Sequence, residues 1–219
     1  MKVLITGASG MIGRLVLNSC LQSEKIMEVI SFVRKPTQQI HPKLTEIVQP
    51  NFQEYSGYEE LFRNAGAAFF CLGVYTGQVP DDEFRKITVN YPVAFAKALE
   101  RNSPGSRFCL LSGAGADRTE KSRTSFARYK GMAENQISKL DLEFYSFRPG
   151  YIYPAEPRQE PNVAYRIFRV LYPLIKILGK KYSIKSTELA SAIFLVGLSG
   201  TQKDILENQD ILEIKTNQG

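Results

Sequence analysis

Residues 1–14 read MKVLITGASGMIGR and give the strongest indication of the fold. A short apolar strand runs into glycines at Gly7, Gly10 and Gly13, and a helix-like apolar run follows them. A strand that turns through glycines into a helix brings backbone N–H groups and the positive end of the helix dipole to an anion. In this reading, Gly7 permits the turn, Gly10 leaves room for phosphates, and Gly13 lets helix and strand pack closely. The stretch therefore predicts a pyrophosphate cradle in a dinucleotide-binding βαβ unit, with an ordinary glycine turn as the alternative.

The second apolar segment ends in two cations. Residues 28–33 are a predicted strand, and Arg34 and Lys35 follow it directly. In a βαβ unit, an acid about 20 positions beyond the last glycine accepts from the ribose 2′-hydroxyl of NAD, whereas an arginine there pairs with the 2′-phosphate of NADP. Arg34 stands at that point and no acid does, and a guanidinium binds phosphate through two hydrogen bonds. The sequence therefore favours NADP(H) over NAD(H), with a solvated basic turn as the alternative.

Apolar runs alternate with amphipathic runs along the chain. This alternation predicts an α/β fold, a doubly wound parallel sheet with helices on both faces, in one domain spanning residues 1–219. Strands are expected at residues 2–6, 28–33, 45–48, 67–72, 107–112 and 143–148. Helices are expected at residues 11–22, 57–64, 81–101, 123–139, 162–178 and 187–198. Prolines cluster after residue 150, so residues 151–219 are expected to form a small helical C-terminal lobe that closes a substrate pocket.

The composition describes a soluble globular protein. Of 219 residues, 43% are hydrophobic and 23% charged, and no apolar run approaches the roughly 18 residues that a membrane span needs. The N-terminus lacks the pattern of a signal peptide, so a cytoplasmic location is expected. The three cysteines (Cys20, Cys71, Cys109) lie far apart in apolar settings, and His41 is the single histidine. A metal site is therefore not expected.

The net charge of +6 raises the question of anionic partners. The chain shows no recognition-helix pattern, zinc spacing or aromatic-basic RNA motif, which argues against a nucleic-acid partner. Residues 165–181 are basic, apolar and aromatic, a composition shared by membrane-surface helices and by substrate lids, and the lid reading is preferred. The expected partner is a small-molecule substrate of unknown identity. A homo-oligomer is compatible with the sequence.

Several short motifs together resemble a known family. They are TGASGMIG at 6–13, FCLG at 70–73, LLS at 110–112, GAD at 115–117, KG at 130–131 and FRPG at 147–150. In this order the chain resembles an atypical short-chain dehydrogenase/reductase, most similar to the branch of the Tat-interacting protein oxidoreductases. The resemblance implies a Rossmann-type fold with NADP(H) bound at the carboxyl ends of the strands.

The expected nucleotide contacts follow from the glycine loop and from this resemblance. By the resemblance, residues 71–73 line the ribose region and residues 149–152 pass beside the nicotinamide. The full set is Gly7, Ser9, Gly10, Met11, Ile12, Gly13, Arg34, Lys35, Cys71, Leu72, Gly73, Lys130, Pro149, Gly150, Tyr151 and Ile152.

The catalytic chemistry implied by the resemblance needs a serine, a tyrosine and a lysine four residues after the tyrosine. Ser112 matches the serine, and Lys130 matches the lysine that binds the nicotinamide ribose and lowers the tyrosine pKa. The residue four positions before Lys130 is Phe126, which has no proton to donate. Tyr129 is a further catalytic candidate, although neighbouring helix positions point about 100° apart. Tyr75, Tyr151 and Tyr153 are other candidate proton donors.

Two functions remain open at this point. One is an oxidoreductase that exchanges hydride with a small carbonyl or alcohol held near Ser112. The other is a non-catalytic regulator that senses NADP(H), which requires the nucleotide to bind two conformations differently. Phe126 favours the regulator, whereas a substrate pocket closed by residues 162–178 would favour the enzyme.

Overall fold

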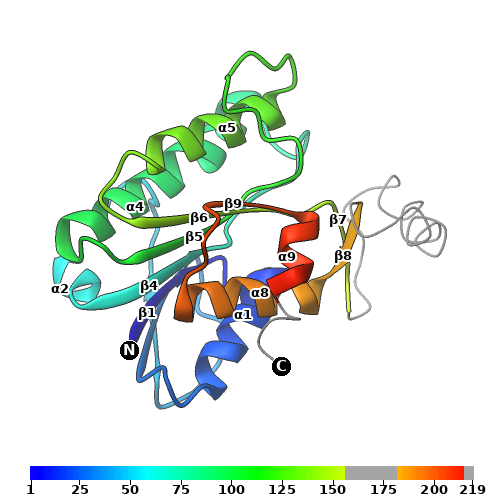
Figure 1. The fold of residues 1–219 in the computed structure, drawn as a ribbon. Coiled ribbons are helices and arrows are strands. Elements are labelled where there is room, and N and C mark those ends of the chain that lie inside the picture. The colour runs from blue at the N-terminus through cyan, green and yellow to red at the C-terminus, as the bar shows by residue number, and fades with distance from the viewer. Residues whose placement is uncertain (156–181, 215–219) are drawn as a thin grey trace.

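A computed structural model describes residues 1–155 and 182–214 of the chain. Its centre is a seven-stranded parallel sheet in the order β3-β2-β1-β4-β5-β6-β9 (Figure 1). The strands are β1 (Lys2–Thr6), β2 (Glu28–Val33), β3 (Leu44–Val48), β4 (Ala65–Phe70), β5 (Arg107–Leu111), β6 (Glu143–Arg148) and β9 (Ile205–Glu207). The predicted α/β fold, a Rossmann-type doubly wound sheet, is confirmed.

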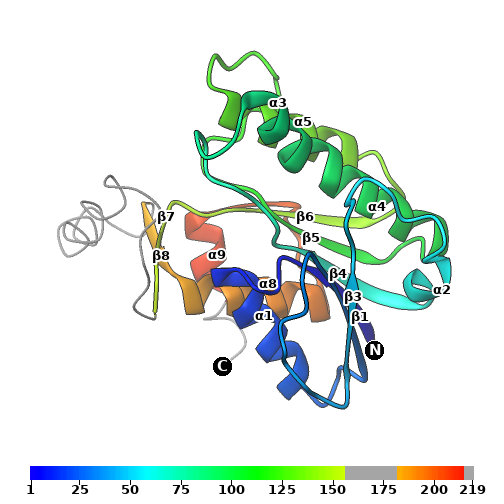
Figure 2. The ribbon, with the colours of Figure 1, turned by 180° about the vertical axis from the view of Figure 1, so that it is seen from behind.

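Helices cover both faces of the sheet, which is why its central strands are apolar throughout. On one face lie α1 (Met11–Gln22), α8 (Ser186–Ser199) and α9 (Asn208–Ile214). On the other face lie α2 (Glu59–Phe62), α3 (Asp81–Arg85), α4 (Tyr91–Asn102) and α5 (Ser125–Ile137), as Figure 2 shows from behind.

The two halves of the core differ in composition. The face under α4 is aromatic, where the rings of Phe32, Phe62 and Phe95 meet with centroids 5.3 to 5.6 Å apart. The face under α1 is mainly aliphatic, and Val16 and Ile193 are buried where α1 packs against α8. Burying each such side chain contributes about 1.5 to 3 kcal/mol, so both helix layers are held mainly by apolar contact.

The helical run from α3 to α4 contains a wider turn. The sequence predicts one helix over residues 81–101, and the structure has a continuous run over residues 81–102 with a π-helical segment, η1 (Lys86–Asn90). Pro92 has no N–H to donate to the carbonyl that would pair with it in an α-helix. The widened turn ends two residues before this proline.

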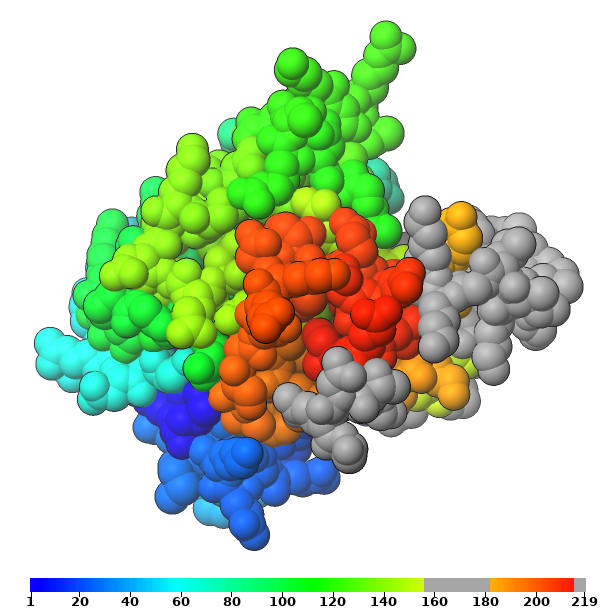
Figure 3. Space-filling view, in the orientation of Figure 1, coloured from blue at the N-terminus to red at the C-terminus, as the bar shows by residue number. Residues whose placement is uncertain are grey.

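The C-terminal part differs most from expectation. A helical lobe is expected over residues 151–219, but the described part includes a second parallel sheet of β7 (Tyr151–Tyr153) and β8 (Ser183–Lys185). It also adds β9 to the main sheet. Three-residue strands are too short to show an alternating pattern, so the sequence does not reveal them. Residues 186–214 lie directly against the main body (Figure 3).

Other boundaries moved by a few residues. Strand β4 begins two residues earlier than predicted, and α2 spans only part of the helix expected over residues 57–64. The helix predicted over residues 162–178 lies outside the described residues. Across residues 1–155 and 182–214, no helix has the length and apolar character to cross a membrane.

Candidate nucleotide-binding site

The glycine loop has the geometry that the sequence predicts. Gly7 adopts a φ of +73°, and a Cβ there would lie 2.6 Å from the backbone of Cys71. A Cβ at Gly13 would lie 2.1 Å from the carbonyl oxygen of Gly7. The turn closes with a hydrogen bond of 2.9 Å from the Gly10 N–H to the same oxygen. A side chain at Gly7 would therefore push the loop away from the segment after β4, and one at Gly13 would push strand and helix apart.

The first turn of α1 carries neither a capping side chain nor a negative charge. Gly10 is the N-cap and supplies no side-chain cap, and the first turn of α1 contains no acidic residue. Ser9 and Gly10 are exposed, whereas Ile12 is anchored in the core and Met11 packs against it. The N–H groups of this turn and the helix dipole make this end a site for an anion.

Arg34 and Lys35 lie beside this loop. Thr6 pairs with Phe32 in the sheet, so the residues that follow β1 and β2 emerge next to each other at the carboxyl edge. Both cations are exposed, and within the described part of the chain neither forms an ion pair. The segment after them is held to β3, because the Thr37 N–H donates to the Glu46 carboxylate at 2.9 Å.

The residues after β4 form the other wall of the cradle. The Cys71 N–H donates to the Thr6 carbonyl at 3.1 Å, which brings residues 71–73 alongside the glycine loop. Cys71 and Leu72 are partly buried and Gly73 is exposed. Burial raises the pKa of the Cys71 thiol to about 12, so this thiol is neutral at physiological pH.

The turn between β6 and β7 is fixed by backbone bonds. The Pro149 carbonyl accepts from the Ala114 N–H at 2.9 Å, and the Tyr151 N–H donates to the Tyr182 carbonyl at 2.9 Å. Ile152 is partly buried and packs against the core under α1. The expected segment of residues 149–152 thus lies at the same edge of the sheet as the glycine loop, where ligands of this fold bind.

Lys130 reaches the end of β5 from α5. Its Nζ donates to the Leu111 carbonyl at 3.0 Å. Burial lowers the pKa of Lys130 to about 8, although the nearby Glu134 carboxylate opposes this shift. The ammonium group therefore sits at the carboxyl edge, where the family resemblance expects it.

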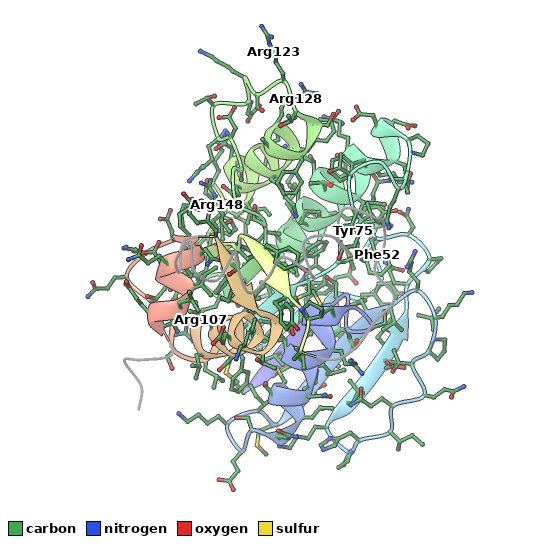
Figure 4. All side chains as sticks on the ribbon, turned by 90° about the vertical axis from the view of Figure 1, so that its right-hand side faces the viewer. Phe52, Tyr75, Arg107, Arg123, Arg128 and Arg148 are labelled. Atoms are coloured by element: carbon green, nitrogen blue, oxygen red, sulfur yellow. The ribbon has the colours of Figure 1, made fainter. Side chains whose placement is uncertain are left out.

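Ser112 is part of a buried polar cluster. Its hydroxyl donates to Glu134 Oε1 at 2.7 Å, and the Ser146 hydroxyl donates to the same oxygen at 2.7 Å. Arg148 donates to both oxygens of Glu134, and Glu134 is fully buried. Arg148 also donates to Glu207 at 3.0 Å. Figure 4 shows Arg148 between α5 and α9. The Ser112 hydroxyl is thus directed to Glu134.

Sequence reasoning missed Glu134. The pattern that could have identified Glu134 is an acid four residues after Lys130, on the face of α5 that also carries the buried Ala127 and Ile137. An acid on a core-facing stripe needs a buried cation or several donors.

The comparisons with known proteins agree with this geometry. Residues 7–172 match a family model described as NAD(P)H-binding. The chain belongs to this NAD(P)H-binding family. No curated protein matches its sequence significantly.

Solved structures with the same fold are distant in sequence. The chain is similar to WbmH of Bordetella bronchiseptica in complex with NAD⁺, with 18% identity, a TM-score of 0.70, and coverage of 94% of this chain and 75% of that one. It is also similar to yeast methylglyoxal/isovaleraldehyde reductase with NADPH, with 14% identity, a TM-score of 0.66, and coverage of 94% and 77%. A UDP-glucose 4-epimerase from Thermotoga maritima matches with 14% identity, a TM-score of 0.66, and coverage of 90% and 73%. These likenesses show a shared fold.

In this member of the NAD(P)H-binding family, Tyr129 faces away from Ser112 and Lys130. Its hydroxyl donates to Asp81 Oδ2 at 2.6 Å, and its ring packs against Phe84 of α3. The structure therefore does not bring this catalytic candidate to the other two. Neighbouring positions on α5 point in different directions, as the helix geometry requires.

The position expected for a tyrosine is filled by an apolar contact. The ring of Phe126 lies against Gly113, where a built Cβ would come within 2.5 Å of the ring Cζ. Residue 113, a glycine, therefore faces the far end of this ring. The other candidate donors, Tyr75, Tyr151 and Tyr153, are partly buried.

Among the described residues, no three His, Cys, Asp or Glu side chains gather to hold a metal ion.

Proposed function

We propose that this chain is an NADP(H)-binding, oxidoreductase-like protein of the atypical short-chain dehydrogenase class, on the branch of the Tat-interacting protein oxidoreductases. The observation that carries the proposal is the cradle between Gly7 and Gly13, which no residue with a Cβ can form. Arg34 stands beside this cradle at the end of β2. The substrate is a small carbonyl or alcohol.

The residues present fit the nucleotide. The N–H groups at the start of α1 would hold the pyrophosphate. Arg34 and Lys35, exposed and without ion pairs in the described chain, would hold the 2′-phosphate, and Lys130 would hold the nicotinamide ribose. When bound, the nicotinamide supplies or accepts a hydride.

The test is calorimetric titration of the protein with NADPH and with NADH. The Arg34→Glu variant should bind NADPH about tenfold or more weakly, because a charge-assisted bond is lost and a like charge replaces it. NADH binding should change less than about twofold. The control is Arg63→Glu, which changes the net charge equally but lies just before β4, at the opposite edge of the sheet.

Two results would overturn the proposal. If neither nucleotide binds at millimolar concentration, the cradle has another role. If Arg34→Glu weakens both nucleotides equally, Arg34 is an ordinary surface cation and the preference for NADP(H) is wrong.

A second function, a non-catalytic regulator that senses NADP(H), is favoured by one observation. Phe126 places a ring without a hydroxyl against Gly113, where a tyrosine would donate a proton. A screen of carbonyl substrates that follows nicotinamide absorbance separates the two functions. Turnover that is lost in Lys130→Ala supports the enzyme, and tight nucleotide binding without turnover supports the regulator.

A further inference from the structure

Asn208 joins three segments that are far apart in the sequence. It is the first residue of α9, directly after β9, and only 3% of it is exposed. Its Oδ1 accepts from the Gly150 N–H at 2.8 Å, in the turn between β6 and β7. Its Nδ2 donates to the Ser183 carbonyl at 3.0 Å, at the start of β8. One buried amide thus satisfies two backbone groups.

The backbone around Gly150 has little freedom of its own. A Cβ at Gly150 would lie 2.5 Å from the Tyr182 carbonyl oxygen, so the two backbones are in close contact. The Tyr151 N–H donates to that same oxygen at 2.9 Å. The Gly150 N–H points instead to Asn208, which therefore determines where this peptide group lies.

The same side chain also sets the small sheet of β7 and β8. Tyr151 pairs with Ser183 in the register of that sheet. Because Asn208 bonds both Gly150 and Ser183, it holds the residue before β7 and the first residue of β8 together. At the far end of the sheet, the Ser186 hydroxyl accepts from the Ala155 N–H at 2.9 Å.

Glu207, the residue before Asn208, holds the other side of the turn between β6 and β7. Glu207 accepts from Arg148 at 3.0 Å, and Arg148 also bonds the buried Glu134 of α5. The segment from Arg148 to Gly150 is therefore attached at both ends to residues 207 and 208. Helix α5, which carries Lys130, is linked to Arg148 through Glu134.

We propose that Asn208 is a positioning residue for the nicotinamide half of the bound nucleotide, acting through Gly150. This inference rests on the proposed function, in which residues 149–152 pass beside the nicotinamide. A buried N–H that loses its acceptor carries a penalty comparable to a hydrogen bond, so the turn would shift when Asn208 is replaced. The adenosine half would be held by the loops after β1 and β2, whereas the Asn208 amide bonds Gly150 and Ser183.

The experiment compares two ligands on the full chain. NADP⁺ contains both halves of the nucleotide, whereas 2′,5′-ADP contains only the adenosine half with its 2′-phosphate. The Asn208→Leu variant should bind NADP⁺ about tenfold more weakly than the wild type. Its affinity for 2′,5′-ADP should stay within about twofold. A loss of packing alone would not discriminate between the two ligands.

Two further variants sharpen the test. Asn208→Asp keeps an acceptor for the Gly150 N–H, so its NADP⁺ affinity should lie closer to the wild type than that of Asn208→Leu. If Asn208→Leu does not fold, Asn208→Asp replaces it in the ligand comparison. Its NADP⁺ affinity should then fall more than its 2′,5′-ADP affinity, because a carboxylate oxygen cannot donate to the Ser183 carbonyl. The matched control is Asn102→Leu, because Asn102 donates to Ala98 within its own helix, and it should change neither affinity.

Each contrary outcome has its own meaning. Equal weakening of both ligands in the Asn208 variants would refute the positioning role and leave a general structural one. Unchanged NADP⁺ affinity in Asn208→Leu would refute it as well. If the wild type binds neither ligand, the proposed function itself fails, and the positioning role falls with it.

Discussion

The ring of Phe126 lies against Gly113, at the position where the proposed function expects a proton-donating tyrosine. A Cβ at Gly113 would come within 2.5 Å of the Phe126 Cζ. Lys130 lies one helical turn further along α5 and reaches the end of β5. Under the proposed function, Lys130 is the lysine expected of a short-chain dehydrogenase, and the Phe126 ring takes the place of the expected tyrosine.

This contact predicts a gain of function. Phe126→Tyr adds a hydroxyl at the ring atom that faces Gly113, where a Cβ would already lie 2.5 Å from Cζ, so the ring has to move away from Gly113 to hold it. Lys130, four residues later, would favour the ionised form of this hydroxyl. We expect NADPH-dependent reduction of small aldehydes to rise about a hundredfold, the usual effect of one positioned acid. The measurement is the loss of nicotinamide absorbance at saturating NADPH.

The control for this gain is the double variant Phe126→Tyr/Lys130→Met, which should lose most of it. A rise that survives removal of Lys130 would show that the new hydroxyl does not work with this lysine. No rise in Phe126→Tyr, with nucleotide binding intact, would mean that a carbonyl does not reach this ring.

The glycines of the loop should respond differently to the same substitution. A Cβ at Gly13 meets the Gly7 carbonyl oxygen at 2.1 Å, whereas a Cβ at Gly10 comes no closer than 3.2 Å to it. Gly13→Ala should therefore lower the melting temperature by several degrees, since strand and helix must separate. Gly10→Ala should keep a near-native melting temperature but lose about tenfold in NADPH affinity, because its methyl group obstructs the phosphates.

Thermal unfolding and calorimetry on both variants check this contrast. If Gly10→Ala binds NADPH as tightly as the wild type, the phosphates do not approach the loop at that residue.

The sequence predicted the parts of the structure that depend on local patterns. The bounds of β1, β2 and β6 agree with the expected strands, because each is a short run built around apolar or aromatic residues between polar turns. The roles of Gly7 and Gly13 are readable for the same reason, since a strand, a glycine turn and a helix follow one another within 22 residues.

Contacts between distant residues were out of reach. The Tyr129 hydroxyl is directed by Asp81, which lies 48 positions earlier on another helix. The Ser112 hydroxyl is directed by Glu134, and the orientation of a hydroxyl depends on which partner the fold brings near. Asn208 acts on residues 58 and 25 positions away, through strands too short to be recognised.

The buried pair of Glu134 and Arg148 predicts a loss of stability. Glu134→Gln leaves Arg148 without its main counter-ion in a position where the arginine side chain is only 12% exposed. Breaking a buried pair by removing one partner costs about 3 kcal/mol or more of unfolding free energy. Urea denaturation measures this loss directly.

The matched control is Glu60→Gln, which removes an exposed ion pair with Arg63. Its effect should stay below about 1 kcal/mol, as for other surface pairs. Similar effects of the two substitutions would show that the Glu134 charge is not needed for the fold.

The lowered pKa of Lys130 predicts that this residue makes the fold more stable as pH rises. Its pKa is about 8 in the folded chain, against an ordinary value of 10.5. Between these values the unfolded chain holds the proton and the folded chain does not, so the unfolded state binds more protons and unfolding becomes harder with increasing pH. The free energy of unfolding of the wild type relative to Lys130→Met should therefore increase by about 1 to 2 kcal/mol from pH 8 to pH 10. Solvent near this partly buried side chain keeps the change below the full value of the pKa shift.

Chemical denaturation at several pH values measures this difference in unfolding free energy. The exposed Lys139→Met serves as the control, and its difference from the wild type should not change with pH. A difference that stays constant or falls over this range would show that Lys130 keeps its proton in the folded protein.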